Sequence, residues 1–272
     1  MDKFEWTGRV GDVWAEEWRR TDRTFEQVDA ELVAAAVGRL ADVAEPRILD
    51  IGCGAGTTSL SLAQRLPDAS MTGIDLSSAL LDVARSRAAD MQRCRFEQGD
   101  ASHWAGEAGF DLLVSRHGVM FFSDPAGAFT HLRSLARPGG TLVFSCFQAA
   151  ALNVWASGLT HLMPGSAGDP LAPGPFAFAD ERHVADILAR AGWRAARARP
   201  LSFDYVAGAG DDPAADAVTY FRRIGPVARA LRELDEPDRA RLLAGLDALV
   251  HRYHVGDRVS FPAAAWIWSA TA

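Results

Sequence analysis

The sequence predicts an α/β fold in which a seven-stranded, mostly parallel sheet ends in an antiparallel strand and carries helical lid elements. Two observations support this prediction. Between residues 47 and 147, short β-branched runs alternate with amphipathic helical patterns, as in parallel sheets with crossover helices. Further along, a long helical insertion separates the last two expected strands.

The expected strands are short apolar runs at residues 47–51, 71–75, 95–98, 110–114, 141–144, 194–206 and 265–270. The helices between the first of these strands are expected to end near Pro67, Asp90 and Pro138. Ser77 has the side chain and the position of an N-cap for the second of them.

The chain is predicted to form a single domain over residues 1–272. Its parts are expected as N-terminal helices in 1–44, a core in 45–148, and two cover insertions in 151–178 and 208–256. Helices are expected at residues 9–20, 22–42, 180–191 and 212–254. Trp14 and Trp18, four residues apart, are expected on one face of the first helix.

Composition limits the partners. The net charge of -7 lacks the surplus of cations that phosphate neutralisation requires, so nucleic acid is not expected as a partner. The arginine-rich stretch 190–199 is interpreted as a solvated helix end and strand face.

The chain is expected to be cytoplasmic and without a membrane partner. No apolar run approaches the ~18 residues that span a bilayer, and residues 1–6 include acids where a signal peptide has a basic flank. Cys53, Cys94 and Cys146 are expected to be free, reduced thiols, since their number is odd and each lies in or next to an apolar strand or a glycine loop.

A glycine loop follows the first expected strand. Residues 50–56 read D-x-G-x-G-x-G, and glycines there allow a tight turn and a close approach of the backbone to a ligand. The dinucleotide motif G-x-G-x-x-G is absent, because Thr57 and Ser59 stand where its third glycine would be. A nicotinamide-dependent oxidoreductase is therefore the weaker alternative.

With this loop, the chain resembles class I S-adenosylmethionine-dependent methyltransferases, whose sheet is Rossmann-like. Asp75 ends the second expected strand, Asp100 follows the third, and residues 135–142 resemble the turn before the family's fifth strand. The resemblance implies S-adenosylmethionine as cofactor and S-adenosylhomocysteine as product. It also implies that Asp75 accepts the ribose hydroxyls and that Asp100 lies near adenine. The predicted cofactor-binding residues are Asp50, Gly52, Cys53, Gly54, Thr57, Asp75, Leu76, Asp100, Ala101 and Ser115.

Three further stretches, at 115–125, 173–180 and 223–226, resemble a bacterial group loosely called ubiquinone/menaquinone-methyltransferase-like. Such group names indicate a lineage more than a substrate.

Methyl transfer needs donor and acceptor held close and in line, and a general base assists when the nucleophile carries a proton. His117, just beyond the fourth expected strand, is the candidate base; a structural hydrogen bond or a place facing the lid are the alternatives. Ser115 is expected to offer its backbone carbonyl to the cofactor. The segment 115–118 lacks the Asn/Asp-Pro-Pro-aromatic pattern of enzymes that methylate nucleobase or glutamine nitrogens.

The acceptor is expected to be a small, apolar or aromatic molecule, with its oxygen, carbon or nitrogen acceptor atom unresolved. Its predicted contacts are Trp18, Arg116, Phe122, Trp155 and Arg223. No metal is expected, because the carboxylates and histidines lack a recognisable ligand spacing.

A cofactor-binding protein of the same fold with non-methylating chemistry or a regulatory role remains the main alternative, because the binding motif is common to both. The sequence does not define the oligomeric state.

Overall fold

The computed structural model describes residues 6–163 and 169–272. Its strands are β1 (Arg47–Ile51), β2 (Ser70–Asp75), β3 (Cys94–Gln98), β4 (Phe110–Arg116), β5 (Ala136–Phe147), β6 (Arg194–Ala209), β7 (His254–Val255) and β8 (Arg258–Thr271). They form one sheet in the order β3-β2-β1-β4-β5-β8-β6, and β7 pairs with β8. Strands β1 to β5 run parallel, and β8 runs antiparallel to both of its long neighbours.

The predicted fold class is confirmed, with one strand more than expected. The additional strand is β7, because the chain reverses at Gly256, where φ is 63°, and two residues pair back onto β8. The last expected helix therefore ends at Arg252, and His254 lies in a strand. A two-residue strand has no alternating pattern that a sequence reveals.

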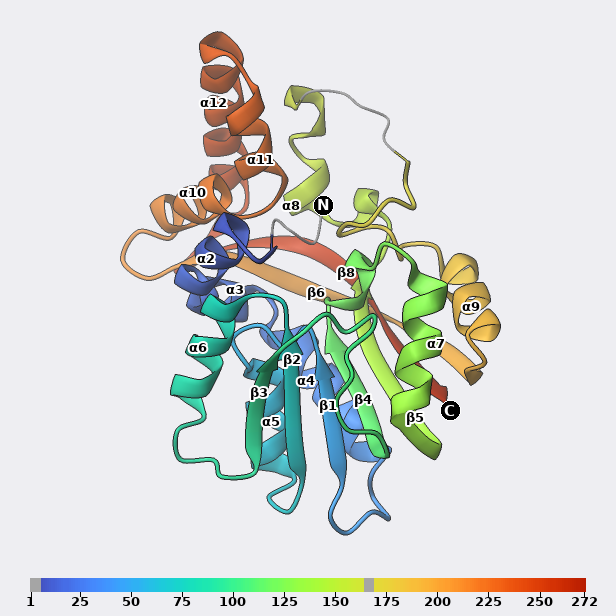
Figure 1. Cartoon of the computed structure of the whole chain (residues 1–272). Helices are drawn as coiled ribbons and strands as arrows, with labels where there is room; N and C mark the ends of the chain where they lie inside the picture. Colours follow the sequence, from blue (N-terminus) through green and yellow to red (C-terminus); the bar gives the residue numbers. More distant parts are fainter. Residues whose placement is uncertain (1–5, 164–168) are drawn as a thin grey trace.

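Helices cover both faces of the sheet. They are α2 (Arg9–Glu16), α3 (Trp18–Thr24), α4 (Glu26–Gly38), α5 (Thr57–Arg65), α6 (Ser78–Arg87), α7 (Pro125–Leu135), α8 (Val154–Ser157), α9 (Glu181–Arg190), α10 (Pro213–Arg223), α11 (Gly225–Glu233) and α12 (Glu236–Arg252). In Figure 1, α7 and α9 lie in front of the sheet, and α4 and α5 lie behind it. Ser77 caps α6 through its hydroxyl, as predicted.

The N-terminal region differs from its prediction. Two expected helices are three, and Trp14 and Trp18 belong to different helices rather than to one face. The chain bends at Glu17, whose buried carboxylate pairs with Arg20 and Arg223. A tertiary ion pair therefore ends α2 earlier than its amphipathic pattern suggests.

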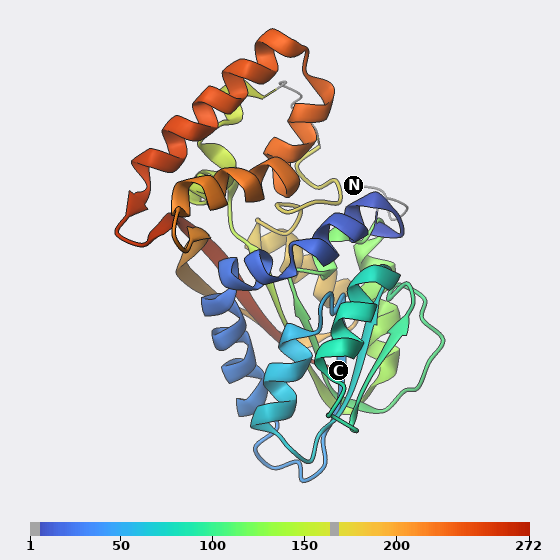
Figure 2. The ribbon, with the colours of Figure 1, turned by 90° about the vertical axis from the view of Figure 1, so that its left-hand side faces the viewer.

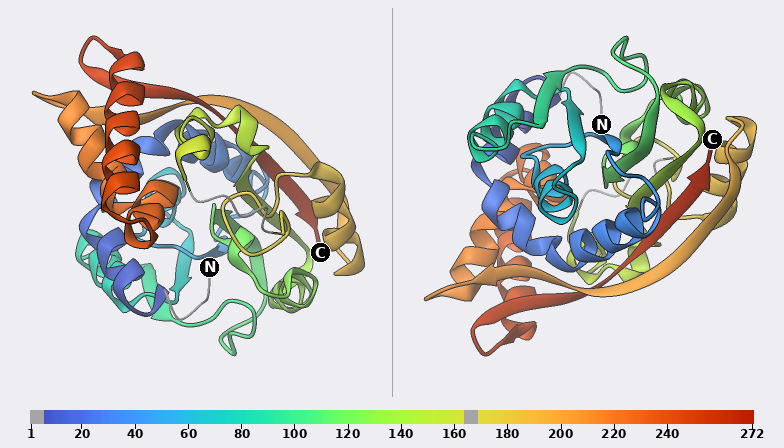
Figure 3. Two further views of the ribbon diagram at one scale, coloured as in Figure 1. Left: turned by 90° about the horizontal axis from the view of Figure 1, so that it is seen from above. Right: turned by 90° about the horizontal axis from the view of Figure 1, so that it is seen from below.

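The cover elements gather at one end of the sheet. Figure 1 shows α8 and α10 to α12 above the strands, and Figure 2 shows α2 and α3 between this group and the sheet. Figure 3, from above, shows the long strands β6 and β8 passing beneath the cover helices. Part of the expected cover insertion, residues 164–168, lies outside the described residues.

Asn153 attaches the start of α8 to the sheet. Its side chain is fully buried, donates to the carbonyl of Ala264 in β8 and accepts from the amide of the same residue at 3.1 Å. Because α8 carries Trp155, this pair of bonds positions one wall of the cavity described below.

We predict that Asn153→Ala lowers the free energy of unfolding by about 2 to 3 kcal/mol, because it leaves the buried Ala264 amide without its side-chain acceptor and removes a fully buried side chain. Urea denaturation measures the change. Ser157→Ala, which removes a hydroxyl that donates to the main-chain carbonyl of Asn153, is the control and is expected to stay within ~0.5 kcal/mol of wild type. Equal midpoints for both variants would contradict the assigned role.

Candidate functional site

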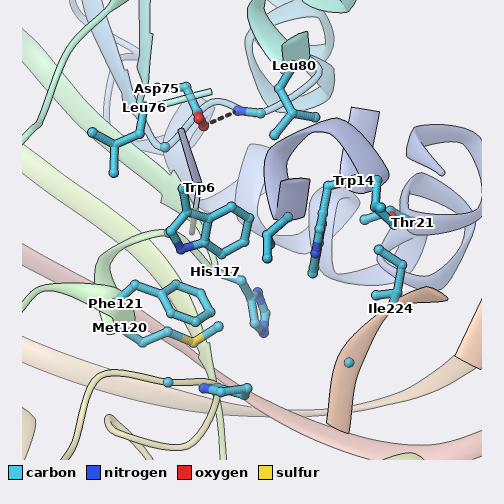
Figure 4. A pocket seen from close by; sticks show the side chains of 18 of the residues that line it. Trp6, Trp14, Thr21, Asp75, Leu76, Leu80, His117, Met120, Phe121 and Ile224 are labelled. Carbon is cyan, nitrogen blue, oxygen red and sulfur yellow. Dashed lines mark hydrogen bonds between the residues drawn. The ribbon is translucent and has the colours of Figure 1, made fainter. Parts of the chain in front are cut away.

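A cavity of about 950 Å³ opens at the carboxyl ends of β1, β2 and β4, beneath the cover helices. Most of the predicted site residues line it: Asp50, Gly52, Cys53, Gly54, Asp75, Leu76, Asp100, Ala101, Arg116, His117, Trp18, Phe122, Trp155 and Arg223. Figure 4 shows Asp75 and Leu76 on one side and His117 on the other, with Trp6 between them. Thr57 and Ser115 do not line the cavity.

The glycine loop needs its glycines for two separate reasons. Gly52 and Gly54 have φ angles of 64° and 53°, in the left-handed region that side chains disfavour. Gly52 also lies against Gly118, because a Cβ on Gly118 would stand 3.3 Å from the Gly52 Cα and 2.8 Å from the Ile51 carbonyl oxygen. The loops after β1 and β4 therefore touch through bare backbone.

Ser115 reinforces this contact. Its hydroxyl donates to the Ile51 carbonyl at 2.7 Å and accepts from the Gly118 amide at 3.3 Å. The residue is fully buried, so its side chain joins the two loops from beneath rather than facing a ligand.

Asp75 presents a carboxylate at the edge of the loop. One oxygen accepts from the Gly54 amide and the other from the Ser77 amide, both at 2.9 Å. Burial raises the pKa of this carboxyl above its usual value, while these amides oppose the shift. A carboxylate has about four lone-pair sites, so two remain for hydroxyl donors.

Two buried polar atoms of residues that line the cavity have no hydrogen-bond partner among the described residues: Asp50 Oδ1, and Arg116 NH1, which lies 3.8 Å from a carboxylate oxygen of Asp29. The other Asp50 oxygen accepts from Ser59 at 2.6 Å, and burial raises the pKa of Asp50 to about 7. Buried donors and acceptors normally have partners, so a carboxylate oxygen and a guanidinium nitrogen here point to a ligand with complementary charges.

A charge network that the sequence did not reveal surrounds these atoms. Asp22 in α3 accepts from Arg116 at 3.0 Å and from Thr57 at 2.6 Å, and it pairs with Arg87 at 3.1 Å. Asp29 accepts from the Thr58 hydroxyl. Thr57, predicted to touch the cofactor, instead connects α5 to α3. No local motif marks these acids, because their partners lie up to 94 residues away.

The residues predicted to contact the acceptor have different neighbours. The Trp18 ring lies beneath the guanidinium groups of Arg87 and Arg19, at 4.1 and 4.4 Å. Arg223 pairs with Glu16 and Glu17, so its charge is already balanced within the protein.

Phe122 packs against Phe129 with ring centroids 6.0 Å apart, so it continues the hydrophobic core to the cavity wall. Asp100 accepts from both the amide and the hydroxyl of Ser102, which shapes the turn after β3.

His117 has a left-handed backbone, with a φ of 58°. Its Nδ1 lies 2.8 Å from the Ser145 hydroxyl, and its buried Nε2 has no hydrogen-bond partner among the described residues. Burial, with a further contribution from the Arg116 guanidinium, lowers the pKa of His117 to about 3. The imidazole is therefore neutral near pH 7.

Aromatic side chains form the part of the cavity around His117. Ring centroids lie 4.3 Å apart for His117 and Phe147, 5.1 Å for Phe147 and Trp155, 5.0 Å for Trp155 and Tyr205, 5.9 Å for Tyr205 and Phe25, and 4.8 Å for Phe25 and His117. These five residues form a closed circuit, here called the aromatic compartment. Only His117 and Trp155 were expected at the site.

Comparisons with known proteins find methyltransferases among the similar chains. Residues 48–140 match the family model described as a methyltransferase domain. Malonyl-[acyl-carrier protein] O-methyltransferase of Paenibacillus sp. is 40% identical over 108 residues, which make up 38% of this chain and 39% of the relative. Trans-aconitate 2-methyltransferase of Escherichia coli is 38% identical over 95 residues, or 35% of this chain and 36% of the relative. The match thus spans under two fifths of either relative.

The fold is also that of solved methyltransferases. Phosphoethanolamine N-methyltransferase 2 of Haemonchus contortus, in complex with S-adenosylmethionine, superposes with a TM-score of 0.58 at 15% identity, covering 100% of this chain and 60% of that one. Fold and domain match define the class: the chain carries a class I methyltransferase domain. Among the described residues, no helix is long and apolar enough to cross a membrane, and no group of three or more potential ligands is placed to hold a metal.

The depressed pKa of His117 predicts a pH effect on stability. In the unfolded chain, His117 is protonated as the pH falls below its ordinary pKa of 6.5. In the folded chain, it stays neutral until about pH 3. The contribution of His117 to the free energy of unfolding is therefore lost as the pH falls through that window. Between pH 6 and pH 4, wild type is expected to lose about 1.4 kcal/mol per pH unit more than His117→Asn.

Urea denaturation of both proteins at several pH values measures this difference. The contributions of the other titrating groups cancel, because both proteins contain them. Asparagine suits the left-handed backbone at this position. Parallel stability curves for the two proteins would show that His117 titrates normally.

Proposed function

We propose that the chain binds S-adenosylmethionine and transfers its methyl group to a small molecule with an apolar or aromatic body. The observation that carries this proposal is the Asp75 carboxylate, fixed by the Gly54 amide, at one end of a cavity whose other end is aromatic. The matched methyltransferase domain supports it. The names of the two curated relatives support a small acid or a carrier-bound acid as the kind of acceptor.

The polar half of the cavity fits an adenosyl amino acid. In this proposal Asp75 accepts the two ribose hydroxyls, and Leu76, Asp100 and Ala101 border the adenine. The Asp50 oxygen without a hydrogen bond suits the ligand's ammonium group, and Arg116 NH1, which has no hydrogen bond but lies 3.8 Å from Asp29, suits its carboxylate. This places Arg116 at the cofactor rather than at the acceptor.

The bound cofactor supplies a methyl group on a positively charged sulfur. The protein has to place the acceptor atom ~3 Å from that carbon and keep water away. The aromatic compartment provides an apolar wall next to the glycine loop, and the cover elements α2, α8 and α10 provide the other sides.

We also propose a single functional domain with the insertions 151–178 and 208–256 as covers, and a cytoplasmic location. The surplus of acidic residues supports small molecules over nucleic acids as partners. The membership in the ubiquinone/menaquinone-methyltransferase-like group remains a prediction from the sequence.

Asp75→Ala is predicted to weaken S-adenosylhomocysteine binding by about 1.5 to 3 kcal/mol, the scale for hydrogen bonds to a charged group. Isothermal titration calorimetry measures this change.

The matched control is Asp82→Ala, which removes an exposed carboxylate paired with Arg85 on α6 and should bind as wild type does. If both variants bound equally, the ribose site would have to lie elsewhere.

Methyl transfer itself is tested with S-adenosylmethionine labelled in the methyl group and a panel of quinols, phenols, amines and carboxylic acids. We expect label in the organic product with at least one class. Binding of the cofactor without transfer to any class would favour the non-methylating alternative.

A further inference from the structure

Two nitrogen atoms of the aromatic compartment have no hydrogen-bond partner among the described residues: His117 Nε2 and Trp155 Nε1. Both residues line the cavity, and each is more than nine-tenths buried. Both rings contact Phe147, with centroids at 4.3 and 5.1 Å. An unpaired buried polar atom costs free energy unless a ligand completes it, so two in one compartment indicate a binding site.

Both atoms are hydrogen-bond donors. An indole nitrogen donates only. For His117, the bond to Ser145 determines the tautomer. The only hydrogen bond found for the Ser145 hydroxyl among the described residues is the one with His117 Nδ1, and the serine is fully buried. If Ser145 donates, its proton is satisfied and the imidazole carries its own proton on Nε2. The opposite tautomer would bury an unsatisfied hydroxyl proton.

The compartment offers no proton acceptor of useful strength. Burial lowers the pKa of His117 to about 3 and raises that of Tyr205 well above its usual value. The acids that line the cavity are Asp22, Asp50, Asp75 and Asp100, which belong to its polar half or to the turn after β3. An acceptor has to arrive with its nucleophilic lone pair already free of a proton.

We propose that His117 Nε2 and Trp155 Nε1 together hold one oxygen of a carboxylate, so that the methyl acceptor is a carboxylic acid on an apolar body. The inference rests on the proposed function. The second carboxylate oxygen uses a lone pair to form the new carbon–oxygen bond, while the carbon–sulfur bond breaks and its electron pair stays on sulfur. The products are an ester and a neutral thioether, and no proton is released.

Charge favours this class over a neutral or cationic acceptor. The reaction joins an anion to a cation and ends with two neutral groups, and such charge loss is easier in a compartment of low polarity. At the rim, Arg222 and Arg232 line the cavity and pair with no carboxylate among the described residues. These cations attract an anion.

Calorimetric titration of the complex with S-adenosylhomocysteine tests the proposal with trans-cinnamate and octanoate against cinnamyl alcohol and 1-octanol. At least one acid is expected to bind at least tenfold more tightly than its alcohol. Trp155→Phe keeps the aromatic wall and removes the donor, so it should weaken the acid about fivefold and leave the alcohol unchanged. The control is Trp266→Phe, whose indole donates to Ala179 away from the cavity and should bind as wild type does.

Nitrogen-15 NMR gives a readout independent of turnover. The neutral Nε2-protonated form of His117 is expected at pH 6, and the acid should move the Trp155 indole proton signal downfield. Alcohols that bind as tightly as the acids, no binding of either acid, or an Nδ1-protonated or charged His117 would overturn the inference. Because S-adenosylhomocysteine binding is measured first, its failure would count against the proposed function instead.

Discussion

The site depends on the contact between two bare backbones, Gly52 after β1 and Gly118 after β4. A side chain on Gly118 would collide with the Ile51 carbonyl, to which Ser115 donates its hydroxyl proton. The sheet order reverses between these two neighbouring strands, and ligands of open α/β sheets bind at such a point. The contact therefore sets the floor of the cavity, and the cofactor half and the aromatic compartment both extend from it.

Local signals predicted the central sheet. Strands β1 to β5, the glycine loop and the Ser77 cap each depend on residues close together in the chain, and all of them are where the sequence placed them within a few residues. The long-range parts were less predictable. The bend at Glu17 follows from an ion pair with Arg223, far along the chain, which no local pattern reveals.

The same reason explains which site residues were missed. Asp22 and Asp29 look like ordinary acids on amphipathic helices, and Phe25 and Tyr205 look like core residues. Their roles arise only when α3, α4 and β6 meet the ends of β1 and β4. Asp75 and Gly54, by contrast, have a spacing that fixes their relation before any tertiary contact is known.

Arg116 and His117 are consecutive but serve opposite halves of the cavity. The left-handed backbone of His117 costs about 1 kcal/mol for a residue with a side chain. The Ser145 bond and the contacts with Phe25 and Phe147 offset that cost. Aromatic rings alone would also suit a cationic acceptor through cation–π attraction. In the proposed site the N–H groups of His117 and Trp155, which have no hydrogen-bond partner among the described residues, oppose a cation, so the polar atoms of the compartment rather than its rings determine which charge it accepts.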